Sequence, residues 1–238
     1  MSRWIVLLDY DGTLVPLAET PQLAAPDRAA LEWLSSIARR ATVHVVSGRA
    51  REVLDRWLGG LPIALHAEHG FWSRTTGQAW RPRFARDVSW IAGVAKRMET
   101  AASALPGAFV ERKASGLAWH YRRAERSAAT RARDSLRAAL TPVLPGEIEI
   151  LDGSCVLEVR DRRANKGSVA RTIVAATPSA MFLAAGDDTT DEDMFAALPD
   201  SAITIRVGQG PTVARERVDD PLAARSRISS LLDREAPP

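Results

Sequence analysis

WIVLLDYDGT, residues 4–13, joins an apolar run of strand length to two aspartates, Asp9 and Asp11. A continuous run of five apolar residues is typical of a strand that is buried on both faces of a sheet. Such a run near an N-terminus can also belong to a signal peptide, but two carboxylates follow it at once and no small-residue cleavage site is present. We therefore interpret residues 4–8 as the first strand of the fold, with two carboxylates at its carboxyl end.

Apolar strands and amphipathic helices alternate along most of the chain. Further strands are predicted at residues 42–46, 63–66, 180–185 and 202–207. Helices are predicted at residues 26–40, 50–58, 165–176, 191–198 and 221–232. Apolar strands that alternate with helices indicate a parallel sheet covered on both faces. Asp27 is the expected N-cap of the first helix, and we expect the end segments MSR and REAPP to be loose.

Residues 84–162 follow a different pattern, in which a helix and two strands are followed by a second helix and two more strands. Asp152-Gly153 separates EIEIL from SCVLEVR and predicts a hairpin turn. The predicted fold class is α/β: a Rossmann-like parallel-sheet core, residues 1–83 and 163–238, with an inserted smaller α/β cap domain, residues 84–162. The cap is expected to be an antiparallel sheet with helices on one face. It either covers an active site, as we expect, or is a structural embellishment.

The composition restricts the class of protein. With 46% hydrophobic and 26% charged residues, a chain of 238 residues is ordinary for a soluble globular protein. Its single cysteine, Cys155, allows no internal disulfide and fits a reducing, cytoplasmic compartment. No run approaches the roughly 18 apolar residues of a membrane span. The sequence pI is about 9.5, but the net charge is only +3 and no basic stripe carries interleaved aromatics, so we expect no nucleic-acid or membrane partner.

Only three of the 32 basic residues are lysines, namely Lys96, Lys113 and Lys166. A chain that otherwise uses arginine retains lysine where a compact ammonium is needed, although Lys96, in a predicted surface helix, shows that this argument is statistical. Lys166 is the most informative of the three, because a cation in the first turn of a helix opposes the helix dipole.

Polar residues follow several of the predicted strands. Asp9-Tyr10-Asp11-Gly12-Thr13 follows the first strand, Ser47-Gly48-Arg49 the second, and Gly186-Asp187-Asp188 the strand at 180–185. Ligands of open parallel sheets bind beyond the carboxyl ends of the strands. Together with Lys166, which opens the helix after the insertion, these residues are expected to converge on one edge of the sheet.

This set of residues suits phosphoryl chemistry. GDDTTDEDMF (186–195) crowds five carboxylates that repel one another unless a positive charge lies among them. Mg²⁺ prefers oxygen ligands, so two or three carboxylates and a substrate phosphate suffice to bind it. A carboxylate can act as a nucleophile toward phosphorus, and a second one two residues on can exchange protons with the leaving group and with water. Ser47 and Lys166 would bind the phosphoryl oxygens.

Each motif also has a simpler explanation. Asp-Gly is common in turns, Ser-Gly can begin a helix, and the acids at 191–193 fit the preference of helix N-termini for negative charge. Asp187 and Asp188 precede that turn and are less easily explained in this way. The position of Asp9 and Asp11, directly after a buried strand and before Gly-Thr, favours a functional site.

Four motifs in matching order, DYDGT, SGR, NKG and GDD, resemble those of the haloacid dehalogenase superfamily of phosphohydrolases. The insertion between the second and third motifs resembles the α/β cap of that superfamily. HAEHG, VERKASGLAWHYR, VLEVRDRRANKG, GDDTTDEDMF and VGQGPTVARERVDDP are similar to stretches typical of trehalose 6-phosphate phosphatases. GDDTTDEDMF is the most specific of these, because related sugar phosphatases usually carry a different fourth motif.

The resemblance implies a role for each matching residue. Asp9 would be the nucleophile and a metal ligand, Asp11 the general acid/base with its main-chain carbonyl on the metal, and Asp187 the third protein ligand of Mg²⁺. Asp188 and Asp191 would contact the metal ligands rather than the metal. Phosphate would be bound by Thr13, Ser47, Gly48 and Lys166, and the sugar by Arg49, Glu111, Lys113 and Glu158.

Strand alternation independently places Glu111 and Lys113 on one face of the cap sheet. Charges on such a face suit a ligand with many hydroxyl groups. The alternative is an ordinary solvated face with a surface ion pair.

The resemblance implies a Mg²⁺-dependent phosphatase that converts trehalose 6-phosphate to trehalose and phosphate through an aspartyl-phosphate. Its partner would be a small-molecule sugar phosphate, with a functional link to a trehalose-phosphate synthase. One alternative is a phosphatase of the same fold for another sugar phosphate, such as glucosylglycerol or mannosylglycerate phosphate. The other is a non-catalytic sugar-phosphate sensor, against which the full set of Asp9, Asp11, Lys166 and Asp187 argues, since a sensor needs no nucleophile.

Overall fold

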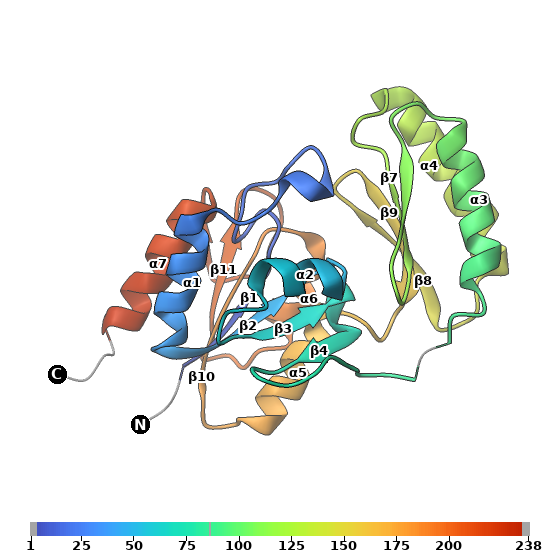
Figure 1. The fold of residues 1–238 in the computed structure, drawn as a ribbon. Helices are drawn as coiled ribbons and strands as arrows, with labels where there is room; N and C mark the ends of the chain where they lie inside the picture. The colour runs from blue at the N-terminus through green and yellow to red at the C-terminus, as the bar shows by residue number, and fades with distance from the viewer. Residues whose placement is uncertain (1–3, 86, 235–238) are drawn as a thin grey trace. The chain divides into compact units, whose positions relative to one another are not determined.

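The computed structural model describes residues 4–85 and 87–234. The segments MSR and REAPP, which we expect to be loose, lie outside the described residues except for Arg234. The chain divides into two compact units (Figure 1): Met1–Arg83 with Asn165–Pro238, here called the core unit, and Phe84–Ala164, the inserted unit. No helix within the described residues is long and apolar enough to span a membrane.

The core unit alternates strands with helices and short 3-10 turns. In chain order its elements are β1 (Trp4–Leu8), η1 (Pro21–Leu23), α1 (Arg28–Ala38), β2 (Ala41–Val46), α2 (Arg51–Leu58), β3 (Ala64–Ala67), η2 (Glu68–Gly70), β4 (Trp72–Arg74), β5 (Arg81–Pro82), α5 (Lys166–Ala176), β10 (Met181–Gly186), α6 (Thr189–Ala196), β11 (Ile203–Val207), β12 (Glu216–Val218) and α7 (Pro221–Arg234).

The strands of the core unit form one sheet in the order β12-β11-β10-β1-β2-β3-β4-β5. From β12 to β3 all neighbours are parallel, which confirms the predicted sheet. The central strand β1 lies between β2 and β10, which come from opposite sides of the insertion. β4 and β5 are antiparallel. They and the parallel strand β12 were not predicted, because each is only two or three residues long and no apolar run marks them.

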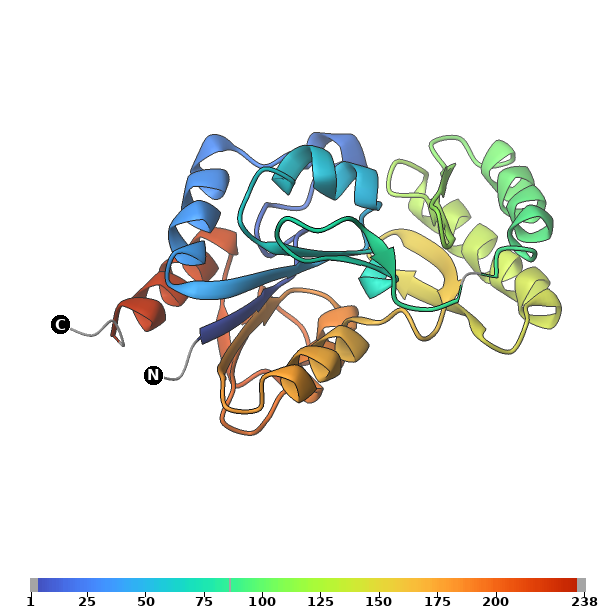
Figure 2. The ribbon, with the colours of Figure 1, turned by 60° about the horizontal axis from the view of Figure 1, so that its bottom comes forward.

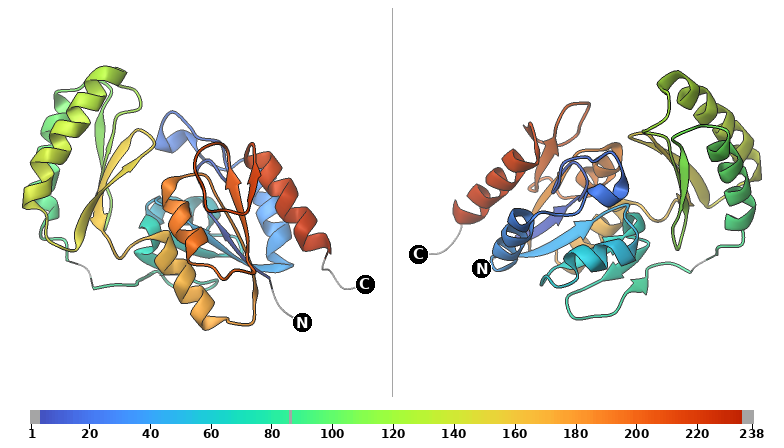
Figure 3. Two further views of the ribbon diagram at one scale, coloured as in Figure 1. Left: turned by 180° about the vertical axis from the view of Figure 1, so that it is seen from behind. Right: turned by 45° about the horizontal axis from the view of Figure 1, so that its top comes forward.

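Helices cover both faces of this sheet, with α5 on one side and α1 and α2 on the other (Figure 2). The buried side chains of α5 and α6 join Ile5, Leu7 and Phe182 in one apolar cluster. On the opposite face α1 and α7 lie side by side (Figures 1 and 3), and Trp33 Nε1 donates to Ser229 Oγ at 2.9 Å. Asp27 caps α1 as predicted, since its Oδ1 accepts from the backbone of the third helical residue at 2.7 Å.

The inserted unit has the predicted order of helix, two strands, helix and two strands. Its sheet is antiparallel, in the order β6-β7-β9-β8, which confirms the expected second sheet. Its elements are α3 (Ile91–Ser103), β6 (Phe109–Arg112), β7 (Leu117–His120), α4 (Arg126–Leu140), η3 (Thr141–Val143), β8 (Ile148–Gly153) and β9 (Val156–Asp161).

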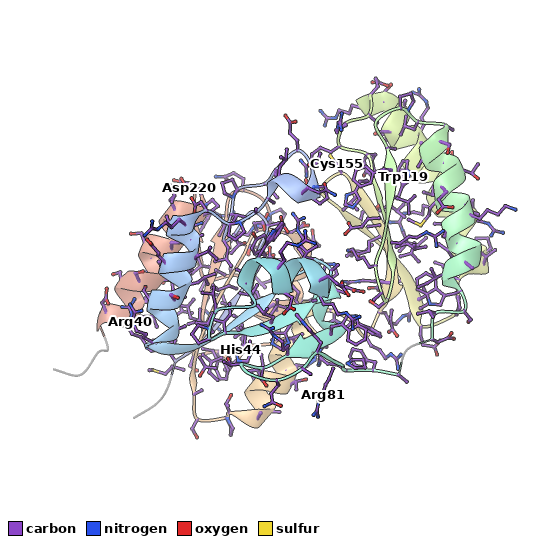
Figure 4. The ribbon with its side chains drawn as sticks, in the orientation of Figure 1. Arg40, His44, Arg81, Trp119, Cys155 and Asp220 are labelled. Atoms are coloured by element: carbon purple, nitrogen blue, oxygen red, sulfur yellow. The ribbon has the colours of Figure 1, made fainter. Side chains whose placement is uncertain are left out.

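One face of this second sheet packs against α3 and α4 (Figures 1 and 3). Leu117, Leu157 and Val159 point to the helices, and Trp119, labelled in Figure 4, is fully buried among them. Alternation along each strand leaves Glu111, Ala118 and Glu158, which are paired across three strands, on the face opposite to the helices. The inserted unit is thus apolar on one face of its sheet and charged on the other.

The predicted hairpin turn at Asp152-Gly153 is wrong by two residues. Gly153 pairs with Val156 at the end of β8, so Ser154 and Cys155 form the turn. Cys155 has a φ of +61°, a conformation that turn positions require but that side chains other than glycine and asparagine seldom adopt. Asp152 belongs instead to the strand, from which its carboxylate accepts a hydrogen bond from Arg137 of α4 at 2.5 Å.

A buried histidine pair connects β2 and β3 within the core unit. His44 Nδ1 and His66 Nε2 are 3.0 Å apart, and the rings stack with centroids 5.3 Å apart. His66 Nδ1 lies 2.8 Å from Ser73 Oγ on β4. Burial lowers the pKa of His44 to about 4. Burial, His44 and Arg83 together lower the pKa of His66 well below its usual value. Both rings are therefore neutral at pH 7.

Acid should destabilise the core unit through this pair. An unfolded histidine has a pKa of about 6.5 and folded His44 one of about 4, so its contribution to stability is complete above pH 6.5 and is lost as the pH falls toward 4. The unfolding free energy of the parent should decrease between pH 7 and pH 4.5, and we expect this decrease to be about 2 kcal/mol smaller in His44→Leu. Urea unfolding at both pH values measures this, and parallel pH dependences of variant and parent would contradict it.

Candidate active site

Polar residues follow four adjacent parallel strands of the core sheet. Asp9 follows β1, Ser47 follows β2, Glu68 follows β3 and Asp187 follows β10. Since these strands are neighbours in the order β10-β1-β2-β3, all four residues lie at the same edge. The chain winds outward in opposite directions from β1 and β10, so the gap between them is the position where parallel sheets bind ligands.

Lys166 forms two buried ion pairs at this edge. Its Nζ is 2.6 Å from Asp9 Oδ1 and 2.8 Å from Asp191 Oδ1, and the lysine side chain is only 3% exposed. Asn165 caps α5 by accepting from Ser168 N at 2.7 Å, which fixes the first turn from which Lys166 projects. The unfavourable position of a cation at a helix N-terminus is thus offset by two carboxylates.

Asp191 has a larger part in this cluster than the sequence indicated. Its Oδ1 accepts from Lys166, while its Oδ2 accepts from the backbone N–H groups of Asp187 and Asp188, both at 3.0 Å. Asp188 is the N-cap of α6 and forms a reciprocal capping box with Asp191. Asp188, which the sequence made less easy to explain by the helix N-terminus than residues 191–193, is thus the N-cap itself. Gly186 is required here, because a Cβ on it would lie 2.2 Å from Asp191 Cγ.

Asp187 lies against the loop that follows β1. Thr13 Oγ1 donates to Asp187 Oδ1 at 3.2 Å. Between Asp11 and Thr13, Gly12 adopts a φ of +79°, and a Cβ on it would lie 2.1 Å from Asp187 Oδ2. Gly12 is therefore needed both for the turn after β1 and for the close approach of this loop to the loop that carries Asp187.

The charges of this cluster are not balanced. Burial and the charges of Asp191 and Asp187 raise the pKa of Asp9 well above its usual value, although Lys166 opposes them. Burial raises the pKa of Asp187 to about 6, with repulsion from Asp191 adding to it and contacts to Asp9 and Lys166 opposing it. Burial alone would lower the pKa of Lys166, but Asp191 and Asp9 hold it above its usual value. Three carboxylates thus share one ammonium, and a further cation would relieve their repulsion.

A divalent metal ion fits this donor set. Asp9, Asp187 and Asp191 each offer an oxygen, and these oxygens all lie within 4.8 Å of one another. Carboxylate oxygens are the ligands that Mg²⁺ prefers. Both oxygens of Asp191 already accept hydrogen bonds, so Asp9 and Asp187 have the greater capacity to bind an ion.

The carboxylate of Asp11 is bound by Arg49. Arg49 Nε donates to Asp11 Oδ2 at 2.7 Å, and its Nη2 donates to the other carboxylate oxygen. The guanidinium also donates to Pro21 O at 2.5 Å and lies over the ring of Trp57. The backbone N–H of Arg49 donates to Ser47 Oγ at 3.1 Å, within the loop after β2. The pair between Arg49 and Asp11 holds this loop to the loop after β1.

Glu68 and His69, for which no role was predicted, complete this edge. They follow β3, are buried, and adopt φ values of +50° and +56°. Their backbone N–H groups donate to Arg49 O and Ser47 O, both at 2.9 Å. The ring of His69 lies so close to Gly48 that a Cβ there would be 2.6 Å from His69 Nε2. Polar residues directly after a buried strand were the available signal, and HAEHG carries it.

Arg206 was also not identified from the sequence. This buried residue of β11 donates to Asp188 O and to Glu192 Oε1, both at 3.1 Å. Glu192 Oε2 in turn accepts from Val213 N at 2.8 Å and from Thr212 Oγ1 at 3.2 Å. The loop that carries Asp187 is thereby tied to the segment between β11 and β12.

The remaining predicted site residues belong to the inserted unit. Lys113 Nζ pairs with Glu158 Oε1 at 2.6 Å, and both side chains are 8% exposed. Glu111 Oε2 lies 2.8 Å from His120 Nε2. Burial alone would raise the pKa of Glu111, but the hydrogen bond with His120 and the charge of Lys113 lower it. These side chains form one polar group on the sheet face opposite to the helices, as strand alternation predicted for Glu111 and Lys113.

Removal of the Lys166 charge should destabilise the core unit strongly. Lys166→Met would leave Asp9 and Asp191 buried without their ammonium, and loss of one partner of a buried ion pair costs about 3–5 kcal/mol. Urea unfolding at pH 7 in the presence of EDTA measures the change. Lys96→Met, at an exposed position, is the control. Equal effects of the two substitutions would show that the buried pairs add nothing to stability.

The sequence matches the family described as trehalose-phosphatase over residues 7–226. A bifunctional trehalose-6-phosphate synthase/phosphatase of Thermoproteus tenax is 45% identical over 233 residues, which cover 97% of this chain and 32% of that protein. A trehalose-phosphatase of Saccharomyces cerevisiae is 34% identical over 223 residues, covering 83% of this chain and 25% of that protein. The chain thus spans a quarter to a third of the length of these curated relatives.

The fold is shared with a solved relative. The C-terminal domain of the trehalose-6-phosphate phosphatase of C. albicans has a TM-score of 0.89 at 26% sequence identity, over 98% of this chain and 92% of that one. The family match includes the ends of β1, β2 and β10 and the start of α5, where the buried charge cluster lies. The chain belongs to the trehalose-phosphatase family.

Proposed function

We propose that this chain hydrolyses trehalose 6-phosphate to trehalose and phosphate, the last step of trehalose biosynthesis. The observation that carries the proposal is the buried group formed by Asp9, Lys166, Asp187 and Asp191 at the switch point of the sheet. A nucleophile, a fixed ammonium and a carboxylate site for a cation are what phosphoryl transfer through an aspartate requires. The names of the relatives from T. tenax and S. cerevisiae support the substrate.

Mg²⁺ is the proposed cofactor. Asp9 and Asp187 would hold it through their carboxylates, and Asp11 through its main-chain carbonyl. The ion would neutralise charge on the phosphoryl oxygens and on the two carboxylates. We assign to Asp191 and Asp188 the task of holding the loop of Asp187 in place, since Asp191 accepts from two backbone N–H groups of that loop and Asp188 caps the helix that follows.

The proposed reaction uses two carboxylates in turn. An oxygen of Asp9 attacks phosphorus, the bond from phosphorus to the sugar oxygen breaks, and Asp11 donates a proton to that oxygen. Asp11 then accepts a proton from a water molecule, which attacks phosphorus and releases phosphate and free Asp9. Because Asp11 is bound by Arg49 here, that ion pair would have to open before the proton transfer, and Arg49 would then be available to the substrate.

Binding of the phosphate is assigned to Thr13, Ser47, Gly48 and Lys166. The ammonium of Lys166 is already fixed by Asp9 and Asp191, so it needs no reorganisation when negative charge develops. Glu111, Lys113 and Glu158 are the proposed contacts to the sugar. Their carboxylate oxygens and ammonium can form hydrogen bonds with hydroxyl groups of the sugar. A trehalose-phosphate synthase is the proposed functional partner, because the T. tenax relative is named as a bifunctional synthase/phosphatase.

Replacement of the nucleophile should abolish turnover without loss of the fold. Asp9→Asn keeps the size of the side chain and removes one charge from the crowded cluster. We expect phosphate release from trehalose 6-phosphate to fall by a factor on the order of 10³ or more, with an unchanged circular dichroism spectrum. Asp55→Asn, at an exposed position on α2, is the matched control. Substantial turnover by Asp9→Asn would refute the assignment.

The sugar contacts should determine affinity more than rate. We expect Glu111→Gln and Glu158→Gln to raise the KM for trehalose 6-phosphate about tenfold or more, with a smaller effect on a generic aryl phosphate. Glu99→Gln is the control, because Glu99 pairs with Arg112 on the helix side of the same sheet. Equal effects on both substrates, or an equal effect of the control, would contradict these contacts.

A substrate panel separates the proposed function from its alternatives. Turnover of glucosylglycerol or mannosylglycerate phosphate, with none of trehalose 6-phosphate, would establish a different sugar phosphatase. Binding of trehalose 6-phosphate with and without Mg²⁺, in the absence of any phosphate release, would establish a sensor.

A further inference from the structure

A groove of about 810 Å³ lies on the outer surface of the inserted unit, between α3 and α4. Leu105 and Leu136 form its buried floor, and Ala101, Ala104, Ala128 and Ala132 line its walls. On α4 the lining residues recur at positions 128, 132, 135 and 139, and on α3 at 97, 101 and 104, so each helix presents one continuous stripe. The groove runs along both helices for about three turns at roughly 1.5 Å per residue.

The charged residues of this groove are all positive. Lys96, Arg97 and Arg131 lie along it and are exposed, and no aspartate or glutamate lines it. Arg97 Nη1 donates to Gly93 O at 3.1 Å and Arg131 Nη1 to Ser127 Oγ at 3.4 Å, which are neutral acceptors.

The carboxylates near the groove accept hydrogen bonds from other groups, although the charge of Arg131 also contributes, after the backbone N–H of Ser127, to lowering the pKa of Glu125. Glu125 accepts from the backbone of Ser127 and Ala128 at the start of α4, Glu99 pairs with Arg112, and Asp134 pairs with Arg133. None of the three cations of the groove therefore forms an ion pair with a carboxylate of the described residues. The groove thus has an apolar floor and a positively charged rim. These are complementary to a ligand that is apolar on one side and acidic on the other.

We propose that this groove binds an acidic amphipathic helix of a partner protein. Small side chains on both walls allow a third helix to approach closely, and its apolar side chains would reach Leu105 and Leu136. Its glutamates or aspartates would face Lys96, Arg97 and Arg131. A second copy of this chain is a poor occupant, because a symmetric contact through the groove would place these three cations against the same three.

A synthetic helix tests the proposal directly. The probe is an 18-residue, fluorescein-labelled peptide with leucines at helical spacing and glutamates on its other face, and its counterpart has lysine in place of every glutamate. Fluorescence anisotropy with the full chain should show saturable binding of the acidic peptide, at least about tenfold tighter than that of the basic one. Equal binding of the two peptides, or no binding of the acidic peptide, would overturn the proposal.

Variants locate the contact. Arg131→Glu should weaken binding of the acidic peptide about tenfold, whereas Arg126→Glu makes the same charge change on the same helix outside the groove and should change it less than about twofold. Ala132→Phe should block the groove without changing the charge. Circular dichroism and phosphatase turnover like those of the parent show that each variant is folded. Equal effects of Arg131→Glu and Arg126→Glu would mean non-specific attraction and refute the groove.

Two other occupants give distinct results. If dodecanoate binds and the acidic peptide does not, the groove is a site for an amphiphilic small molecule and the proposal fails. If the chain alone sediments as a dimer that Arg131→Glu dissociates, the groove is an interface between copies and the proposal fails as well.

Discussion

The ammonium of Lys166 between Asp9 and Asp191 is the interaction on which the candidate active site depends. Three carboxylates within 4.8 Å of one another could not all be ionised in a buried site without it. The same ammonium fixes the start of α5 relative to the ends of β1 and β10, so it is a structural contact as well as a chemical group. The pKa values of Asp9 and Asp187 stay raised despite Lys166, which leaves the site short of positive charge. The proposed binding of a cation would thus follow from an incomplete ion-pair network.

Several small residues follow from this crowding. Gly12 and Gly186 each lie where a Cβ would be within 2.2 Å of an aspartate of the cluster, so the acidic loops can approach only because these positions lack side chains. Gly48 has the same relation to His69. The loops after β1, β2 and β10 are therefore packed through glycines on one side and held by side-chain hydrogen bonds on the other. Arg206 and Glu192 extend this support to the segment before β12, well beyond the catalytic motifs.

The sequence predicted the elements that have a strong periodic pattern. Five of the six parallel strands of the core sheet, and the order of elements in the inserted unit, follow from apolar runs and turn residues, whereas the three-residue β12 was not predicted. The strands β4 and β5 lack such runs, and they form by pairing of β4 with β3 and of β5 with β4. The hairpin turn was misplaced because Asp-Gly is a local preference, whereas the register between β8 and β9 is set by packing of alternate side chains against α3 and α4.

The positions of some candidate-site residues, but not their contacts, could also be predicted from the pattern of strands and helices. Residues directly after buried strands, such as Asp9 and Asp187, are placed by topology alone, and topology could be read from the order of strands and helices. The different roles of Asp188 and Asp191 could not be predicted. Asp188 caps α6 and Asp191 binds Lys166, and the position of each within one turn of the helix decides between these roles. Glu68 and His69 were overlooked although they directly follow a buried strand, because the residue types do not show the left-handed backbone that these two positions adopt.

The charge cluster around Lys166 and the groove along α3 and α4 differ in solvent exposure, and the contrast bears on what each can bind. The charged groups around Lys166 are largely buried, so each must find a partner, and their arrangement is fixed before any ligand arrives. Along α3 and α4 the cations of the groove remain hydrated at the surface, where leaving them unpaired has little cost. A buried cluster of this kind can discriminate between ligands by geometry, since a misplaced charge cannot be solvated. A hydrated rim cannot do so, and its selectivity must come from the sign of the charge and from the shape of the apolar floor between the helices.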